Sequence, residues 1–188
     1  MKIFSAFGEA GTIYTDDKEI YNKLLFYRYN GSERKDYRYK YTYKYSSLNF
    51  RMDEIQAAVL NQKLSNIQQS INKRKHLANL YNDLLKDVVK TPERRKNEEK
   101  IYYTYTVNVN KDYRNKLQNF LRQKNIETKI YYEKLIPEVA PYNKLNFKKN
   151  IKNAKRIANE IISLPMHENL SEDQIYYTCK NIKNFFNA

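Results

Sequence analysis

The stretch that decides the fold is residues 49–87, NFRMDEIQAAVLNQKLSNIQQSINKRKHLANLYNDLLKD. Its apolar residues recur every three to five positions, a spacing that places them on one face of an α-helix. They are Met52, Ile55, Val59, Leu60, Leu64, Ile67, Ile71, Leu77, Leu80, Leu84 and Leu85. The pattern predicts one long helix, or two helices with a bend at residues 72–75. Asn49 is the expected N-cap, since its side chain can accept a hydrogen bond from a first-turn amide.

Before this helix, the chain begins with small residues, two glycines and a β-type run, MKIFSAFGEAGTIYT. Residues 12–15 favour a strand, and Asp16 with Glu19 forms a capping box for a helix that ends near Tyr29. Strand, turn and helix in this order are typical of α/β architecture. Lys2 precedes the glycines. It is either an ordinary residue near a terminus or an amine that its surroundings activate as a nucleophile.

Residues 37–45, YRYKYTYKY, place tyrosine at every second position, with cations at Arg38, Lys40 and Lys44 between them. In an extended chain the tyrosines lie on one face and the cations on the other. Such a face suits nucleic acid, because rings stack on bases and cations meet phosphates. We favour instead a loop or edge strand whose tyrosines cover a neighbouring surface, since no complete single-strand-binding motif accompanies the alternation.

After residue 90 the pattern changes to a smaller α/β unit. The expected elements are a polar hinge at 91–100, strands at 101–109 and 128–132, and helices at 112–123 and 152–162. Residues 163–167 should be extended, because Pro165 disfavours helix at the residue before it. Ser171 and Gln174 form a capping box for a last helix. Its apolar stripe consists of Ile175, Cys179, Ile182 and Phe185 or Phe186.

The composition limits the classes of protein that fit. The chain has 188 residues, a formal net charge of +14 and a single cysteine, Cys179. One cysteine excludes an intrachain disulfide and is typical of a reducing compartment, and no apolar run approaches the ~20 residues of a membrane helix. We therefore expect a cytoplasmic protein with no membrane partner and with nucleic acid as a disfavoured one. The sequence contains no metal-ligand cluster, no catalytic serine triad and no phosphate loop.

Three segments together resemble a known family. Residues 8–24 (GEAGTIYTDDKEIYNKL), 49–60 (NFRMDEIQAAVL) and 154–175 (AKRIANEIISLPMHENLSEDQI) are similar to the DegT/DnrJ family of pyridoxal-phosphate-dependent nucleotide-sugar aminotransferases. The resemblance implies an α/β fold, the C-terminal part of the aspartate-aminotransferase-like fold of type I pyridoxal-phosphate-dependent transferases. The parts that it implies are a remnant of the large cofactor domain at 1–48, a long connecting helix at 49–90 and a small αβ domain at 91–188.

The resemblance also assigns roles to three residues. Lys2 stands where the family's lysine binds pyridoxal 5′-phosphate covalently and then acts as the general base. Asn49 matches an asparagine that reaches across the dimer to the neighbouring cofactor phosphate. Arg51 would lie near the same site as a substrate residue, unless it pairs with Asp53 or Glu54. The implied reaction transfers an amino group from glutamate to a nucleotide-linked keto-sugar.

Some segments depart from the family pattern. Glu9-Ala10-Gly11 replaces an acidic-Gly-Gly turn, and residues 131–142 alter the substrate loop. The region that precedes the lysine in relatives supplies the aspartate on the pyridinium nitrogen and most phosphate contacts. We therefore expect a truncated or split aminotransferase, inactive alone, that acts as a homodimer or with a complementing N-terminal polypeptide. The alternatives are a basic, Tyr-rich module that binds nucleic acid or anions, and a dimerisation scaffold built on the long helix.

Overall fold

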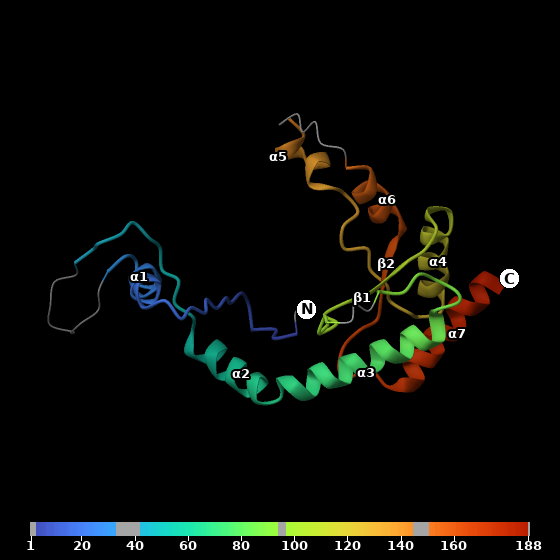
Figure 1. Ribbon diagram of the computed structural model, residues 1–188, viewed down its shortest axis with the longest axis horizontal. Helices are drawn as coiled ribbons and strands as arrows, with labels where there is room; N and C mark the ends of the chain where they lie inside the picture. Colours follow the sequence, from blue (N-terminus) through green and yellow to red (C-terminus); the bar gives the residue numbers. More distant parts are fainter. Residues whose placement is uncertain (1–2, 33–41, 94–96, 145–150, 188) are drawn as a thin grey trace. The chain divides into compact units, whose positions relative to one another are not determined.

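The computed structural model describes residues 3–32, 42–93, 97–144 and 151–187 (Figure 1). Internal contacts divide the chain into two units, residues 1–67 and 68–188. Lys2 and residues 37–41 of the Tyr-rich stretch lie outside the described residues. The domain boundaries expected after residues 48 and 90 stay a prediction.

A pair of antiparallel strands lies at the centre of the second unit. These are β1 (Tyr105–Asn108) and β2 (Ile161–Leu164). Their register pairs Tyr105 with Leu164, Thr106 with Ser163, Val107 with Ile162 and Asn108 with Ile161. Single bridges extend the pairing on both sides, from Lys90 to Asn108 and from Lys129 to Ser163. The strand expected at 101–109 is therefore shorter than predicted, and the one expected at 128–132 is reduced to a single bridge.

The start of β2 corrects another prediction. The helix expected at 152–162 ends earlier than predicted. Helix α6 covers Lys152–Glu160, and Ile161 and Ile162 belong to strand β2. The backbone N–H of Val109 donates to the carbonyl of Glu160 (2.8 Å), so pairing with the β1 segment begins where the helix ends. β-Branched isoleucines pack well on a pleated strand, which favours this outcome.

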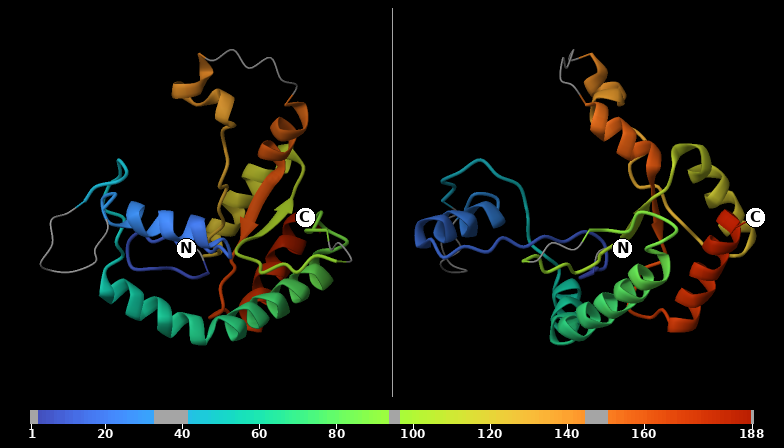
Figure 2. Two further views of the ribbon diagram at one scale, coloured as in Figure 1. Left: turned by 60° about the vertical axis from the view of Figure 1, so that its left-hand side comes forward. Right: turned by 45° about the vertical axis from the view of Figure 1, so that its right-hand side comes forward.

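Helices pack around the two strands. Besides α6, they are α3 (Ile67–Leu85), α4 (Lys111–Gln123) and α7 (Glu172–Asn187). The short helices η1 (Ile136–Glu138) and α5 (Ala140–Asn143) contact each other. Helix α4 contacts α6, α7 and β2 (Figure 2). The helix predicted at 112–123 is confirmed as α4. The predicted capping box of the last helix is also confirmed, because the amide of Ser171 donates to Gln174 Oε1 (3.0 Å) and the amide of Gln174 to Ser171 Oγ (3.2 Å).

The core of this unit contains two buried tyrosines among aliphatic side chains. Its members are Leu77, Ala78, Tyr81, Leu85, Val89, Tyr105, Val107, Val109, Leu117, Leu121, Ile126, Ile162, Leu164, Leu170, Ile175, Cys179 and Ile182. The rings of Tyr81 and Tyr105 stack with centroids 4.6 Å apart. Their hydroxyls donate to the carbonyl of Pro165 (3.1 Å) and to Asn82 Oδ1 (2.7 Å). Both rings are thus buried without leaving a hydroxyl unsatisfied.

One buried cation, Arg74 of α3, joins segments that are far apart in sequence. Its Nε and Nη2 donate to Glu168 Oε2 at 3.0 and 2.6 Å. Its Nη1 donates to the carbonyls of Tyr102 (3.2 Å) and Met166 (3.3 Å). The side chain of Arg74 is only 5% exposed. The guanidinium therefore connects α3 to the segment that enters β1 and to the one that leaves β2.

In the first unit, α1 (Lys18–Arg28) begins one residue later than predicted. The cap is Asp17, whose Oδ1 accepts hydrogen bonds from the amides of Glu19 (2.8 Å) and Ile20 (3.0 Å). The capping role predicted for Asp16 is therefore wrong. Two adjacent aspartates offer the same chemistry, and the sequence alone does not distinguish them.

The strand expected at residues 12–15 has no partner strand within the described residues. Ile13 and Tyr14 are 70% and 85% exposed. In the same unit Leu60 is the one apolar side chain counted as buried among the described residues. A β-type run without a strand to pair with remains an irregular extended segment.

The long helical stretch is interrupted. Helix α2 (Glu54–Ser65) ends one residue before Asn66, and α3 begins at the residue after it. The break therefore lies upstream of residues 72–75, where a bend was expected. Ser65 Oγ donates to the carbonyl of Gln62 (2.9 Å), a local side-chain bond that competes with the backbone ladder of a helix.

Replacing Arg74 with Met should lower the free energy of unfolding by about 3 kcal/mol, because Glu168 and the carbonyls of Tyr102, Tyr103 and Met166 lose their donor. Chemical denaturation followed by circular dichroism measures this change. Arg156→Met is the matched control, since Arg156 pairs with Glu160 on a helix surface (2.6 Å). That exposed pair contributes about 0.5 kcal/mol or less. Equal losses in the two variants would contradict the role assigned to Arg74.

The contribution of Glu168 should be lost in acid. Burial opposes ionisation of this carboxyl, but a backbone N–H and the guanidinium of Arg74 outweigh it and hold the pKa of Glu168 below its ordinary value. The unfolded state then takes up a proton first as the pH falls, so the stabilisation is complete at neutral pH and disappears through the acidic range. Unfolding curves between about pH 7 and about pH 3 should fall less steeply for Glu168→Gln than for the unchanged chain. Parallel curves would show that Glu168 titrates identically in both states.

Candidate functional site

The segment that follows Lys2 is fastened to α2. Side chains of α2 donate hydrogen bonds to three of its backbone carbonyls. These bonds run from Gln56 Nε2 to Phe7 O (2.5 Å) and Glu9 O (3.2 Å), and from Lys63 Nζ to Ser5 O (2.5 Å). Lys2 itself lies outside the described residues, so its catalytic role stays a prediction.

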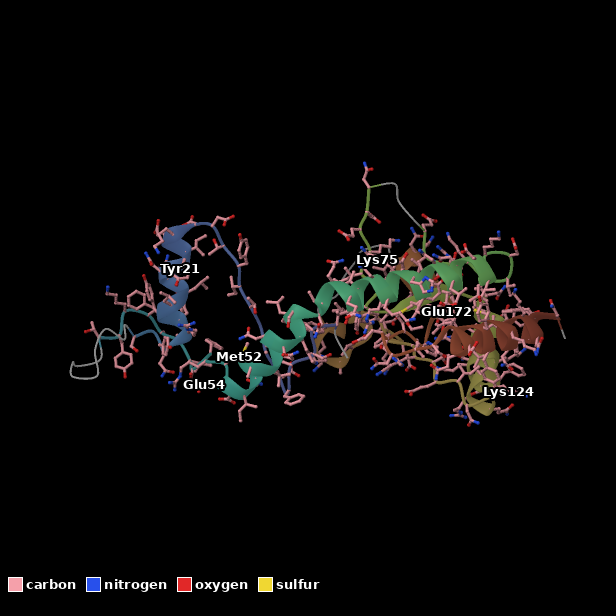
Figure 3. All side chains as sticks on the ribbon, turned by 90° about the horizontal axis from the view of Figure 1, so that it is seen from below. Tyr21, Met52, Glu54, Lys75, Lys124 and Glu172 are labelled. Carbon is pink, nitrogen blue, oxygen red and sulfur yellow. The ribbon has the colours of Figure 1, made fainter. Side chains whose placement is uncertain are left out.

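The segment that carries Asn49 is extended rather than helical. Asn49 forms an antiparallel bridge with Tyr29, and the amide of Phe50 donates to the carbonyl of Arg28 (3.3 Å). The N-cap of α2 is Asp53, which forms a capping box with Gln56. The N-cap role predicted for Asn49 is therefore wrong. Its side chain is engaged elsewhere, and the cap Asp53 lies four residues later. Figure 3 labels Met52 and Glu54 near the start of α2.

The side-chain amide of Asn49 is held in one orientation. Its Oδ1 accepts two hydrogen bonds from Arg51, one from the backbone N–H (3.2 Å) and one from Nε (3.0 Å). An asparagine amide has one oxygen acceptor and one nitrogen that carries two donor hydrogens. Because Oδ1 is engaged within the chain, Nδ2 is the group left for an external acceptor. The contacts of Arg51 are thus with Asn49 rather than with Asp53 or Glu54.

Two arginines share one aromatic ring beside Asn49. The guanidinium carbon of Arg28 lies 4.9 Å from the centroid of the Tyr29 ring, and that of Arg51 lies 5.7 Å from it. Both distances fit cation–π contacts. Among the described residues, neither arginine forms an ion pair with a carboxylate. We call Arg28, Tyr29, Asn49 and Arg51 the Tyr29 cluster; it presents positive charge and amide donors.

A glycine turn fixes the approach to this cluster. Gly31 has a φ of +77°, and a Cβ at this position would lie 1.7 Å from the carbonyl oxygen of Tyr45. The Gly31 carbonyl accepts a hydrogen bond from the amide of Lys44 (2.8 Å). Ser47 Oγ donates to the carbonyl of Tyr27 (2.8 Å). These contacts bring the chain back beside the end of α1, where Tyr29 and Asn49 meet.

The described end of the Tyr-rich stretch packs on α1. The Tyr45 ring lies 5.6 Å from that of Phe26 and 5.1 Å from that of Tyr27. Tyr43 is 64% exposed. For Tyr45, the contacts agree with a tyrosine that covers a neighbouring surface. The alternation at residues 37–41 lies outside the described residues and stays untested.

Other reactive groups do not add to this site. Burial raises the pKa of the Cys179 thiol to about 12, which keeps it protonated and unreactive at neutral pH. His76 Nε2 is hydrogen-bonded to Glu172 Oε1 (2.8 Å) at the start of α7, and the His76 side chain is 56% exposed. In the described ranges, no group of three or more His, Cys, Asp or Glu residues is arranged to hold a metal ion.

A profile of the DegT/DnrJ/EryC1/StrS aminotransferase family matches residues 1–183. The chain belongs to this family. The resemblance carried by residues 8–24, 49–60 and 154–175 is thereby confirmed. Within the described residues of this DegT-family chain, no helix has the length and apolar character needed to cross a membrane.

Curated relatives include proteins with and without an enzymatic name. The Pleiotropic regulatory protein of Geobacillus stearothermophilus is 32% identical over 190 residues, which cover 98% of this chain and 49% of the relative. The UDP-2-acetamido-2-deoxy-3-oxo-D-glucuronate aminotransferase of Pseudomonas aeruginosa is 28% identical over 188 residues, with coverages of 97% and 49%. The DegT-family chain thus spans about half the length of these relatives.

Solved structures of the family share the fold. A DegT DnrJ EryC1 StrS aminotransferase from Brucella abortus is 28% identical and superposes with a TM-score of 0.82, over 93% of this chain and 46% of the other. The expected fold class is confirmed: the chain has the α/β structure of part of the aspartate-aminotransferase-like fold.

The sequence patterns did not predict Arg28 or Tyr29 as site residues. The only local signal was a cation in the last turn of a helix.

Replacing Gly31 with Ala should separate the end of α1 from the Asn49 segment. The added Cβ collides with the Tyr45 backbone and the residue must keep a positive φ, which together cost at least about 2 kcal/mol. Amide hydrogen exchange of residues 28–32 and 47–51 measures the loss of protection. Gly11→Ala is the control, because a Cβ on Gly11 meets nothing within 4 Å. Unchanged protection in Gly31→Ala would contradict this turn geometry.

Proposed function

We propose that this chain provides part of the catalytic site of a pyridoxal-phosphate-dependent nucleotide-sugar aminotransferase. The amino donor is glutamate and the acceptor is a nucleotide-linked keto-sugar. Family membership and the names of relatives such as the Pseudomonas aeruginosa enzyme support the reaction class. The observation that carries the proposal is the fixed orientation of Asn49, which leaves its Nδ2 donors available to a phosphate oxygen.

The donor chemistry of the Tyr29 cluster fits the phosphate of pyridoxal 5′-phosphate. Amide and guanidinium N–H groups are strong donors to phosphate oxygens, and guanidinium also carries the opposite charge. The cluster contains no carboxylate that would repel such an anion. In the proposal, Asn49 binds the cofactor phosphate of the neighbouring subunit in a homodimer, and Arg51 both orients Asn49 and contacts the substrate.

Pyridoxal phosphate, when bound, supplies the electron sink on which amino-group transfer depends. In the proposal, the Lys2 amine holds the cofactor covalently and, once released, takes and returns the proton that moves during transfer. Gln56 and Lys63 hold the backbone of the segment that follows Lys2.

Because the chain spans about half the length of its relatives, we propose that activity needs a complementing N-terminal polypeptide, and that the chain alone is inactive. The nucleic-acid alternative lacks a comparable observation. The described Tyr45 ring is occupied by Phe26 and Tyr27 and is not free to stack on a base.

The test is covalent labelling of Lys2. The full chain, alone and with the N-terminal half of the Geobacillus stearothermophilus relative, is incubated with substoichiometric pyridoxal phosphate, reduced with borohydride, digested and analysed by mass spectrometry. We expect label at Lys2 in preference to other lysines, and more strongly with the added half. Lys2→Arg should carry no label at this position, because a guanidinium does not form an imine that borohydride can reduce.

A second measurement follows the chemistry. With glutamate and a nucleotide-linked keto-sugar, the combined polypeptides should form 2-oxoglutarate, and Lys2→Ala should abolish it. Lys18→Ala is the matched control, because Lys18 is an exposed lysine of the same unit, residues 1–67. Label spread evenly over the lysines, with and without the added half, would overturn the proposed function.

A further inference from the structure

The Tyr29 cluster contains a residue to which the resemblance assigns no role. Arg28 lies in the last turn of α1, with its guanidinium over the same ring that Arg51 contacts. Arg28 and Arg51 are 23 positions apart in the chain and come together because Asn49 pairs with Tyr29. Two cations gathered on one ring, with no carboxylate paired to either in the described residues, carry uncompensated positive charge.

We propose that Arg28 is a phosphate ligand in the same site as Asn49 and Arg51, and that Tyr29 is the residue that positions both guanidinium groups. This inference rests on the proposed function and adds two residues to its site. The ligand class is a phosphoryl anion. Its source is either the cofactor monophosphate or the diphosphate of the nucleotide sugar.

Like charges held close to each other destabilise the arrangement unless an anion or solvent compensates them. A ring face attracts each guanidinium by about 0.5–1 kcal/mol at an exposed site, enough to order it but not to neutralise it. A bound phosphate removes the repulsion and gains hydrogen bonds from planar donors that match its geometry.

The donors of the cluster complement one another. Arg51 uses Nε to hold Asn49 Oδ1, so its remaining guanidinium N–H groups and Asn49 Nδ2 stay available. The contact that the structure gives Arg28 is the one with the Tyr29 ring, so all of its N–H groups are available as well. The backbone hydrogen bond from the amide of Phe50 to the carbonyl of Arg28 fixes the point from which this side chain extends.

The position of Arg28 has a simpler explanation, which a substitution can distinguish from phosphate binding. A cation in the last turn of a helix interacts favourably with the helix dipole, and this interaction needs only the charge. Lysine satisfies the dipole as well as arginine does, but it lacks the planar donors for two hydrogen bonds to one phosphate. The variant Arg28→Lys therefore distinguishes a phosphate ligand from a helix-terminal charge.

The experiment measures binding of two probes by isothermal titration calorimetry on the full chain. Pyridoxine 5′-phosphate carries the cofactor's monophosphate but has no aldehyde, so its binding does not depend on covalent attachment to Lys2. Uridine diphosphate represents the nucleotide portion of the substrate. The probe that loses more affinity in Arg28→Gln identifies the source of the anion.

We expect Arg28→Gln to weaken binding of one probe roughly 10-fold to 100-fold, the effect of losing hydrogen bonds from a charged donor. Arg28→Lys should recover only part of this loss. Tyr29→Leu should also weaken binding, whereas Tyr29→Phe should retain it, because the ring alone positions the guanidinium groups. Rescue by phenylalanine is a result that loss of folding would not produce.

Lys18→Gln is the matched control. Lys18 lies over the ring of Tyr21 at 4.8 Å, at the other end of α1, so this variant removes one charge and one cation–π contact of the same kind. Its binding should be unchanged. An equal loss in Lys18→Gln and Arg28→Gln would reduce the effect to overall charge and overturn the inference.

Three further results would overturn it. The first is full affinity in Arg28→Lys. The second is unchanged affinity in Arg28→Gln while Arg51→Gln and Asn49→Ala lose binding. The third is absence of binding of both probes to the unchanged chain. The second result leaves the proposed function intact. Selective labelling of Lys2 tests that function separately, because it reports covalent attachment and not phosphate affinity.

Discussion

The buried guanidinium of Arg74 is the contact on which the order of the second unit depends. It lies on α3 and donates hydrogen bonds to Glu168 and to the backbone carbonyls of Tyr102 and Met166. One side chain thus contacts the segment before β1 and the segment after β2. A guanidinium has a rigid planar set of donors, and the acceptors must occupy matching positions. Burial of this charge is offset only in that arrangement, which makes the contact specific as well as stabilising.

The two units are stabilised by different kinds of interaction. The second has an apolar core around Tyr81 and Tyr105, whereas the first buries Leu60 and is organised in its described part mainly by hydrogen bonds to backbone carbonyls. Gln56 and Ser47 provide such bonds on the two segments that carry the candidate site. The site geometry therefore depends on polar contacts that water can compete for, and less on the packing that fixes the core.

Predictions from sequence succeeded where the deciding signal is local. The Ser171–Gln174 capping box and the helix now seen as α4 each follow from a few neighbouring residues. They failed where a distant partner decides: Ile161 and Ile162 continue a helical pattern but join a strand because β1 pairs with them. Likewise, Asn49 has the chemistry of an N-cap, but its pairing with Tyr29 across the chain determines its conformation, and the same pairing created the cluster that local patterns did not reveal.

The two hydrogen bonds from Arg51 to Asn49 Oδ1 make Asn49 sensitive to a change of a single atom. Conversion of this asparagine to aspartate would leave the shape of the side chain almost unchanged. The oxygen that Arg51 holds would remain, but the outward nitrogen would become a negatively charged oxygen. The new carboxylate would then neutralise the neighbouring arginines and occupy them as an internal counter-ion. The charge of this surface thus depends on a single side-chain atom of Asn49.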